Sequence, residues 1–136
     1  MIGIDTNVLV RYLVEDDARQ TAEAARLMEG AAAEGEAIFI SQIVICELVW
    51  VLSIAYEMPR REIAYLLHQL RRAATVTLEA ADEVQRALTS FENGRGDLAD
   101  YLIAERAISN GCRSIATFDR ALYADKRFVR PAAARE

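Results

Sequence analysis

The sequence predicts an α/β fold in which a parallel sheet is covered by helices on both faces. Short apolar or β-branched runs alternate with longer segments of helical periodicity along the whole chain. The 136 residues suit one domain, and 53% of them are hydrophobic, enough to fill a single core. The connections between parallel strands are expected to be right-handed.

The N-terminal segment carries the first functional signal. An apolar run over residues 1–4 stops at Asp5, and Thr6 and Asn7, both good N-cap residues, precede an apolar helical pattern. Ligands of open α/β sheets bind at the carboxyl ends of the strands, so Asp5 is a candidate functional residue. The alternative is that Asp5 only caps the following helix.

The remaining chain divides into elements of the same two kinds. Further helices are expected at 18–33, 42–56, 60–72, 80–91 and 97–109, with a short one at 120–124. Further strands are expected at 37–40, 74–78, 114–117 and near 127–129. The segment 42–56 is apolar nearly all round, which predicts a central, buried helix. Residues 1–130 are expected to form a single domain and residues 131–136 a flexible tail.

Charge and composition restrict the class of protein. The net charge of -5 argues against a simple nucleic-acid-binding module, but not against a nuclease whose acids hold a divalent metal. The most apolar stretch contains Glu47 and is not typical of a membrane span, and no signal-peptide pattern begins the chain, so a cytoplasmic protein is expected. Cys46 and Cys112 are expected to be buried free thiols, with a disulfide as the alternative.

Several acidic residues stand where their neighbours are apolar. Glu47 is the only charged residue between Glu36 and Glu57, in the middle of the most apolar helix. An unpaired buried carboxylate is strongly unfavourable, so Glu47 is expected either to pair with an arginine or to bind a metal.

A second group of acids follows in the C-terminal half. Asp97 and Asp100 lie three residues apart at the start of a helix, ahead of an apolar stripe, and their charges repel unless a cation lies between them. Asp97 has the alternative role of helix N-cap. Asp119 follows the strand expected at 114–117, and its alternative role is a turn or helix cap.

One hypothesis covers Asp5, Glu47, Asp100 and Asp119: they converge on a divalent-cation site at the carboxyl edge of the sheet. Oxygen ligands suit Mg²⁺ or Mn²⁺, whereas zinc is disfavoured because the single histidine, His68, has no partner at ligand spacing. Metals held by carboxylates recur in phosphodiester hydrolysis, where they activate a water and stabilise the leaving oxygen. No glycine-rich nucleotide-binding motif is present.

These residues stand in motifs that resemble the PIN domain, and in particular the VapC-type toxin ribonucleases of type II toxin–antitoxin pairs. The similarity covers nearly the whole chain in the right order. The motifs are Ile4-Asp5-Thr6-Asn7-Val8-Leu9, Ser41 with Glu47-Leu48, Asp97-Leu98-Ala99-Asp100-Tyr101-Leu102-Ile103-Ala104, and Thr117-Phe118-Asp119.

The resemblance implies a three-layer, Rossmann-like α/β/α sandwich with a central parallel sheet of about five strands. It implies an Mg²⁺- or Mn²⁺-dependent endoribonuclease that is usually a homodimer and is bound by a small antitoxin whose C-terminal segment obstructs the acidic site. By position, the catalytic and metal-binding acids are Asp5, Glu47, Asp100 and Asp119, with Asp97 as a further metal contact. The supporting residues are Thr6, Asn7 and Thr117. A basic substrate groove is not evident in the sequence; candidates for contacting the RNA substrate are Arg11, Arg60, Arg61, Arg71, Arg72 and Arg95, and a solvated helix face is the favoured alternative for most of them.

Two other functions are kept as alternatives. Haloacid-dehalogenase-like phosphatases use an aspartate nucleophile, here Asp5, but they carry a second aspartate where this chain has Asn7, and the downstream lysine and paired aspartates are missing. A catalytically silent interaction module with a PIN fold is the other alternative, and the complete set of four acids argues against it.

Overall fold

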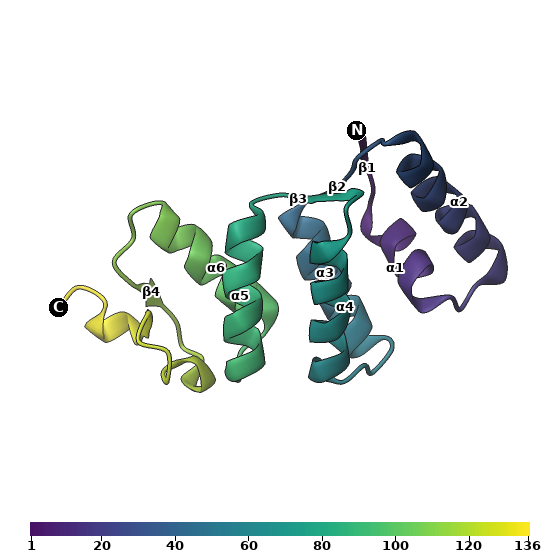
Figure 1. Ribbon diagram of the computed structural model, residues 1–136. Coiled ribbons are helices and arrows are strands. Elements are labelled where there is room, and N and C mark those ends of the chain that lie inside the picture. The colour runs from purple at the N-terminus through teal and green to yellow at the C-terminus, as the bar shows by residue number, and fades with distance from the viewer. The chain divides into compact units, whose positions relative to one another are not determined.

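The computed structural model describes residues 1–136, which divide into two compact units, Met1–Ala81 and Asp82–Glu136 (Figure 1). Each unit is an α/β assembly with its own small sheet. Every strand pair is parallel, which confirms the α/β prediction. The five strands form a three-stranded sheet in the first unit and a two-stranded sheet in the second. The prediction of a single domain over residues 1–130 stays a prediction.

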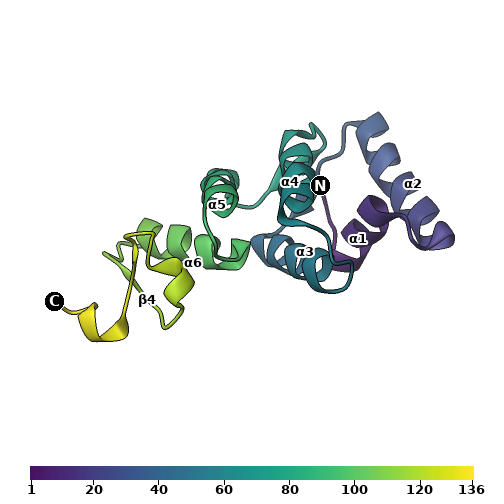
Figure 2. The ribbon, with the colours of Figure 1, turned by 90° about the horizontal axis from the view of Figure 1, so that it is seen from below.

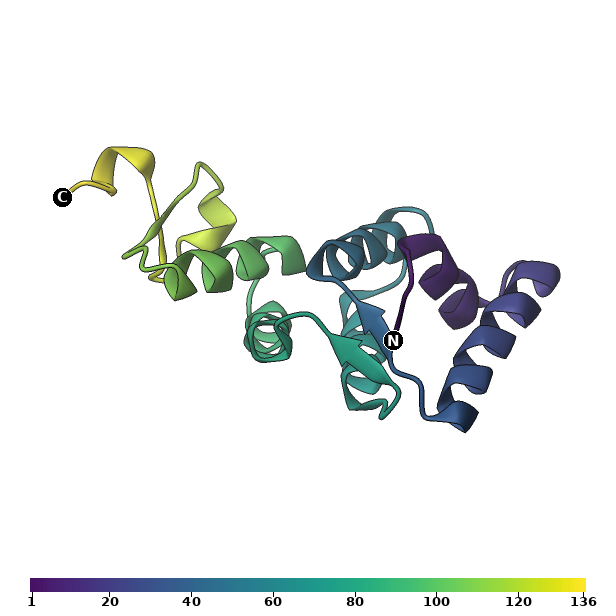
Figure 3. The same ribbon diagram turned by 90° about the horizontal axis from the view of Figure 1, so that it is seen from above.

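The first unit contains a parallel sheet of order β1-β2-β3 and four helices. In the register of the sheet, Ile38 lies between Ile2 and Val76, and β2 and β3 run side by side (Figure 3). Helices α1 and α2 lie next to each other (Figure 2). The elements in chain order are β1 (Ile2–Gly3), α1 (Thr6–Val14), α2 (Ala18–Glu34), β2 (Ile38–Ile40), α3 (Gln42–Ile54), α4 (Arg60–Arg72) and β3 (Val76–Leu78).

Short polar residues begin these helices. The side chains of Asp5, Asp17 and Ser41 accept backbone N–H bonds at the starts of α1, α2 and α3. Gly35 ends α2 with a φ of 70°, the left-handed conformation that glycine adopts without strain. The N-cap of α1 is therefore Asp5, one of the roles that the sequence had offered for it, and not Thr6 or Asn7.

Helix α3 is buried on one side only, so the prediction of a helix buried all round is wrong. Its core side packs Val44, Ile45, Leu48, Val49 and Leu52. On the opposite stripe Ile43, Trp50 and Ile54 are between 63% and 72% exposed. A helix presents only one stripe to the layer that it covers, and the excess of apolar residues in this segment did not reveal which stripe remains outside.

The second unit contains two α-helices, a two-stranded sheet and two 3-10 turns. Its core is formed by the facing sides of α5 and α6, and Tyr101 meets Phe128 of β5 edge to face with ring centroids 6.3 Å apart. Its elements are α5 (Ala81–Asn93), α6 (Leu98–Ser109), β4 (Ile115–Ala116), η1 (Arg120–Leu122), β5 (Phe128–Val129) and η2 (Pro131–Ala133). Part of the tail is thus folded, and Arg113 Nη2 donates to Ala134 O over 3.1 Å.

The two cysteines are free thiols in different environments. Cys46 is half-buried, and this burial raises the pKa of its thiol. Cys112 is exposed, so the expectation of a buried thiol is wrong at that position. None of the helices is both long and apolar enough to cross a membrane.

Candidate active site

Asp5 has a local role as well as a candidate catalytic one. Its Oδ1 accepts the Val8 N–H over 3.1 Å, which is the N-cap bond of α1. The side chain is exposed at the end of the segment that continues β1, and it lines a cavity of about 480 Å³ together with Asn7 and Arg11. The helix-cap interpretation is confirmed, and it leaves Asp5 Oδ2 outside the cap bond.

Glu47 lies on the exposed stripe of α3, so the prediction of a buried carboxylate is wrong. Its Oε1 accepts a hydrogen bond of 3.1 Å from Oγ1 of Thr6, a residue that is 9% exposed. The partner of Glu47 is therefore a hydroxyl and not an arginine. The bond joins the first turn of α1 to the middle of α3 and fixes the direction in which the Glu47 carboxylate points.

Arg11, a candidate for RNA contact, is held by a polar cluster that the sequence did not reveal. Its Nε donates to Gln20 Oε1 over 2.6 Å, and its Nη1 lies 3.1 Å from Asp16 Oδ1. The Tyr56 hydroxyl donates to Asp16 Oδ2 over 2.6 Å, and this bond lowers the pKa of the Asp16 carboxyl. The cluster fixes the guanidinium on the wall of the cavity that contains Asp5.

In the second unit, Asp97 and Asp100 form a capping box at the start of α6. The Asp97 N–H donates to Asp100 Oδ2 over 2.9 Å. Burial raises the pKa of Asp100, and the negative charges of Asp97 and Asp119 act in the same direction, against the opposing effect of the Asp97 N–H. Asp100 therefore also has a capping role, which the sequence interpretation assigned to Asp97 alone.

Asp119 begins the short turn η1. Its Oδ1 accepts the Ala121 N–H over 3.0 Å, and its own N–H donates to Thr117 Oγ1 over 3.0 Å. The capping role is again confirmed, and the side chain is exposed. Thr117 therefore fixes the backbone from which the Asp119 carboxylate projects.

The loop before Asp97 is packed tightly against Tyr101. The Gly96 N–H donates to the Tyr101 hydroxyl over 3.0 Å in a buried position. A Cβ atom at Gly96 would collide with Leu122 Cδ2 and would lie 3.1 Å from the Tyr101 ring. A side chain there would force Leu122 and Tyr101 to move, so this close packing holds the chain just before the acids of α6.

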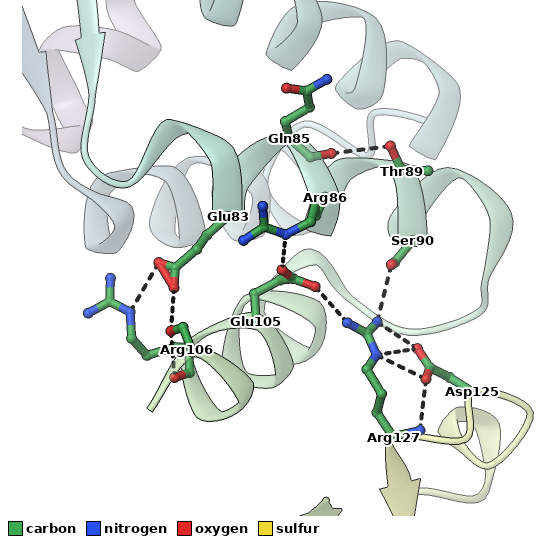
Figure 4. Close-up of polar contacts among 10 residues, drawn as sticks. Glu83, Gln85, Arg86, Thr89, Ser90, Glu105, Arg106, Asp125 and Arg127 are labelled. Carbon is green, nitrogen blue, oxygen red and sulfur yellow. Dashed lines mark hydrogen bonds and ion pairs between the residues drawn. The ribbon is translucent and has the colours of Figure 1, made fainter. Parts of the chain in front are cut away.

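The acids that are buried in the second unit are Glu83 and Glu105, not the expected ones (Figure 4). Glu105 accepts bonds from Arg86 Nε at 2.5 Å and from Arg127 Nη1 at 2.6 Å. Glu83 lies 3.3 Å from Arg106 Nε. Both carboxylates are paired with arginines, which offsets the cost of burying their charge, and the pairs join α5, α6 and the residue before β5. Glu105 follows the buried residues Leu98, Tyr101 and Leu102 at intervals of seven, four and three residues. This helical spacing is the sequence signal that could have indicated its burial.

The predicted site residues thus fall into two sets. Thr6 and Glu47 are joined in the first unit, which also carries Asp5. In the second unit, the charges of Asp97 and Asp119 act on Asp100. Neither unit alone contains a group of three or more His, Cys, Asp or Glu side chains that could hold a metal ion. The donors are all carboxylate oxygens, which fit Mg²⁺ or Mn²⁺, and the like-charge repulsion around Asp100 is the electrostatic condition that a cation relieves.

Comparison with known proteins identifies the family. The model of the PIN domain family matches residues 2–128, nearly the whole chain. A curated protein named VapC ribonuclease, from Aquifex aeolicus (strain VF5), is 25% identical over 118 residues, which cover 86% of each chain. The three-layer α/β/α fold that the sequence predicts is the fold of this family. The chain belongs to the PIN domain family and is similar to its VapC-type members.

Proposed function

We propose that the protein is an Mg²⁺- or Mn²⁺-dependent endoribonuclease and the toxin component of a toxin–antitoxin pair. Membership of the PIN domain family and the relative named VapC ribonuclease support a nuclease of the toxin type. The observation that supports metal dependence is the electrostatic effect of Asp97 and Asp119 on Asp100. Burial raises the pKa of Asp100, the negative charges of Asp97 and Asp119 act in the same direction, and a bound cation would relieve this repulsion.

In this proposal Asp5, Glu47, Asp100 and Asp119 hold the metal, with Asp97 as a further contact. When bound, the metal supplies an activated water and positive charge for the leaving oxygen. The chain's own contribution is to fix the carboxylates in direction: Thr6 holds Glu47 by a bond of 3.1 Å, and Thr117 holds the Asp119 backbone.

The same proposal includes the partners. We propose an RNA substrate, a cognate antitoxin, a homodimer and action in the cytoplasm, and the similarity to a VapC ribonuclease supports these proposals. The match to the PIN domain family favours this function over the phosphatase with an Asp5 nucleophile.

A cleavage assay tests the proposal. Purified protein is incubated with total RNA in Mg²⁺, in Mn²⁺ and in EDTA, beside the variants Asp5→Asn and Asp100→Asn. The control is Glu29→Gln, which removes one carboxylate from the exposed surface of α2. We expect discrete cuts that need the metal, persist in the control and disappear in both aspartate variants. Mn²⁺ titration calorimetry on the same proteins should show binding that both aspartate variants weaken.

Other outcomes would contradict the proposal in different ways. Cleavage that persists in both aspartate variants would reject the site assignment. If the parent protein neither cleaves RNA nor binds Mn²⁺, the result would favour the catalytically silent interaction module.

A further inference from the structure

Two neighbouring hollows of the second unit share Arg120, the residue that follows Asp119. The first has a volume of about 550 Å³ and is lined by Arg95, Arg120, Ser90 and Asn93. The second has a volume of about 430 Å³ and is lined by Arg120, Phe118, Tyr123 and Arg130. Both hollows offer guanidinium groups. Asp119 lines neither of them, but the residues on either side of it, Phe118 and Arg120, both line the second.

These arginines differ from the three arginines of the second unit that pair with glutamates or aspartates. Arg86, Arg106 and Arg127 are paired with buried or half-buried acids. The Arg95, Arg120 and Arg130 side chains, in contrast, are exposed and have neither a hydrogen-bond nor an ion-pair partner. Unpaired arginines are available to bind phosphate, because the planar guanidinium matches two phosphate oxygens.

The acids near these hollows do not cancel the positive charge. Asp125 lines the first hollow, but it lies 2.7 Å from Arg127 Nη2, and that contact lowers the pKa of its carboxyl. Asp119 is the remaining acid beside Arg120, and in the proposed function its charge is balanced by the metal. The guanidinium groups of Arg95, Arg120 and Arg130 therefore remain available at these hollows in a chain whose net charge is -5.

Phe118 adds an aromatic face to this surface. Its side chain is 87% exposed, although a phenylalanine is normally buried. The turn that presents it is fixed, because Thr117 accepts bonds at both its hydroxyl and its carbonyl oxygen: Asp119 N–H donates to Oγ1 over 3.0 Å and Tyr123 OH to the carbonyl over 2.6 Å. An exposed ring on a rigid turn is preorganised to stack against a flat ligand.

We propose that Phe118, Arg95, Arg120 and Arg130 form an RNA-binding patch that holds a single-stranded segment of the substrate next to Asp119. Phe118 stacks on an unpaired base, and the arginines bind the flanking phosphates. Proteins that bind single strands combine these two contacts, whereas a paired helix does not offer a base for stacking. This inference rests on the proposed ribonuclease function and assigns the substrate contacts of that site.

Fluorescence anisotropy with a labelled pool of random 12-nucleotide single-stranded RNA tests the patch. The full chain carries Asp5→Asn in every sample, so that the probe is not cut in Mg²⁺. The test variant is Arg120→Gln/Arg130→Gln, and the matched control Arg19→Gln/Arg26→Gln removes two exposed charges from α2. We expect affinity to fall at least tenfold in the test variant and less than twofold in the control. The slope of log affinity against log salt should become shallower by about 1.4 for two lost phosphate contacts in a single strand.

The aromatic contact has its own pair of variants in the same assay. Phe118→Leu keeps an apolar side chain without a ring and should weaken binding about tenfold, whereas Phe118→Tyr should bind like the parent. A fully paired RNA duplex should bind more weakly than the single strand and should not respond to Phe118→Leu.

The outcomes that overturn the patch can be distinguished from failure of the proposed function. If the parent cleaves and binds RNA but the patch variants bind equally well, the patch is rejected and the ribonuclease stands. If the parent neither binds nor cleaves RNA, both are rejected. If the patch variants lose binding to a polyglutamate peptide but not to RNA, the surface serves an acidic protein partner instead.

Discussion

The Thr6 hydroxyl donates a hydrogen bond of 3.1 Å to the Glu47 carboxylate, across 41 positions of the chain. This contact joins the first turn of α1 to α3, and it orients an acid that the proposed mechanism uses. Thr6 is buried and Glu47 is exposed, so the fixed hydroxyl of Thr6 determines the direction in which the Glu47 carboxylate points.

Thr6→Val tests that orientation, because valine has nearly the same shape and lacks the hydroxyl. Loss of a residue that orients a metal ligand typically costs about 10- to 100-fold in activity or metal affinity, and we expect RNA cleavage to fall by that factor. Thr6→Ser keeps the donor and should retain cleavage within about threefold of the parent. Equal activity of the valine and serine variants would show that the bond is not used.

Asp5 combines a helix cap with a proposed catalytic role, and two substitutions separate them. Asparagine caps a helix as well as aspartate does, so Asp5→Asn should change the free energy of unfolding by less than about 0.5 kcal/mol. Asp5→Ala should cost about 1 kcal/mol because it removes the bond to the Val8 N–H. RNA cleavage should be lost in both. Urea denaturation beside the cleavage assay checks this, and a fully active Asp5→Asn would contradict the assignment.

Removing one arginine from the network of the second unit should destabilise the fold (Figure 4). Arg127→Ala removes one partner of Glu105, which retains Arg86, so we expect a loss of about 2 kcal/mol, below the usual cost of breaking a buried ion pair. Arg113→Ala is the control, because its exposed side chain binds only the Ala134 carbonyl, and it should cost less than about 0.5 kcal/mol. Chemical denaturation measures the free energy of unfolding of both variants. Equal losses in Arg127→Ala and Arg113→Ala would show that the Arg127 ion pairs do not contribute to stability.

Asp125 makes stability depend on pH in a defined direction. Its bond to Arg127 lowers the pKa of the carboxyl in the folded state, so the unfolded chain binds more protons between the two pKa values. Stability from this group is therefore complete above the unfolded pKa of about 3.9 and is lost as the pH falls through the lower folded pKa. At pH 7 the parent should exceed Asp125→Asn by about 1 kcal/mol. Melting temperatures from pH 7 to pH 2 should converge, and a difference that widens in acid would contradict this account.

Gly96→Ala should destabilise the protein, because the added methyl group meets Leu122 and Tyr101 in a buried position. Overpacking of this kind costs about 1–3 kcal/mol. Gly30→Ala is the control and should have the opposite effect. Gly30 lies within α2 with open space around it, so alanine there should raise the free energy of unfolding by about 0.5–1 kcal/mol. Thermal unfolding of both variants is the measurement. An unchanged melting temperature of Gly96→Ala would show that the neighbouring side chains move to accommodate the methyl group.

Local patterns predicted the elements well. Helix α4 begins after Pro59 and ends at Arg72 as expected, because its amphipathic spacing and its boundary signals agree. The strands β2, β3, β4 and β5 lie within the expected apolar segments. The predicted starts of α2 and α3 were likewise correct, because the side chains of Asp17 and Ser41 accept the backbone N–H three residues further along the chain.

The errors arose where the environment depends on distant residues. Burial of Glu47 was inferred from its apolar neighbours, yet a helix that is apolar all round has no pattern that shows which stripe is covered. The pairing of Glu105 with Arg127 joins elements 22 positions apart. Arg120 and Arg130 were not among the candidates for RNA contact, because only the folded turns after β4 and β5 bring them to one pair of hollows.

The N-cap bond of Asp5 has a consequence for how activity can be lost in a living cell. Exchange of one carboxylate oxygen for an amide removes the charge but leaves an acceptor for the Val8 N–H. An inert form of the chain that still folds is therefore a single substitution away. Because unfolded chains are the ones that proteases remove, such a form would persist; if the proposed toxin role holds, cells under selection to escape it would keep a harmless copy that still binds the proposed antitoxin.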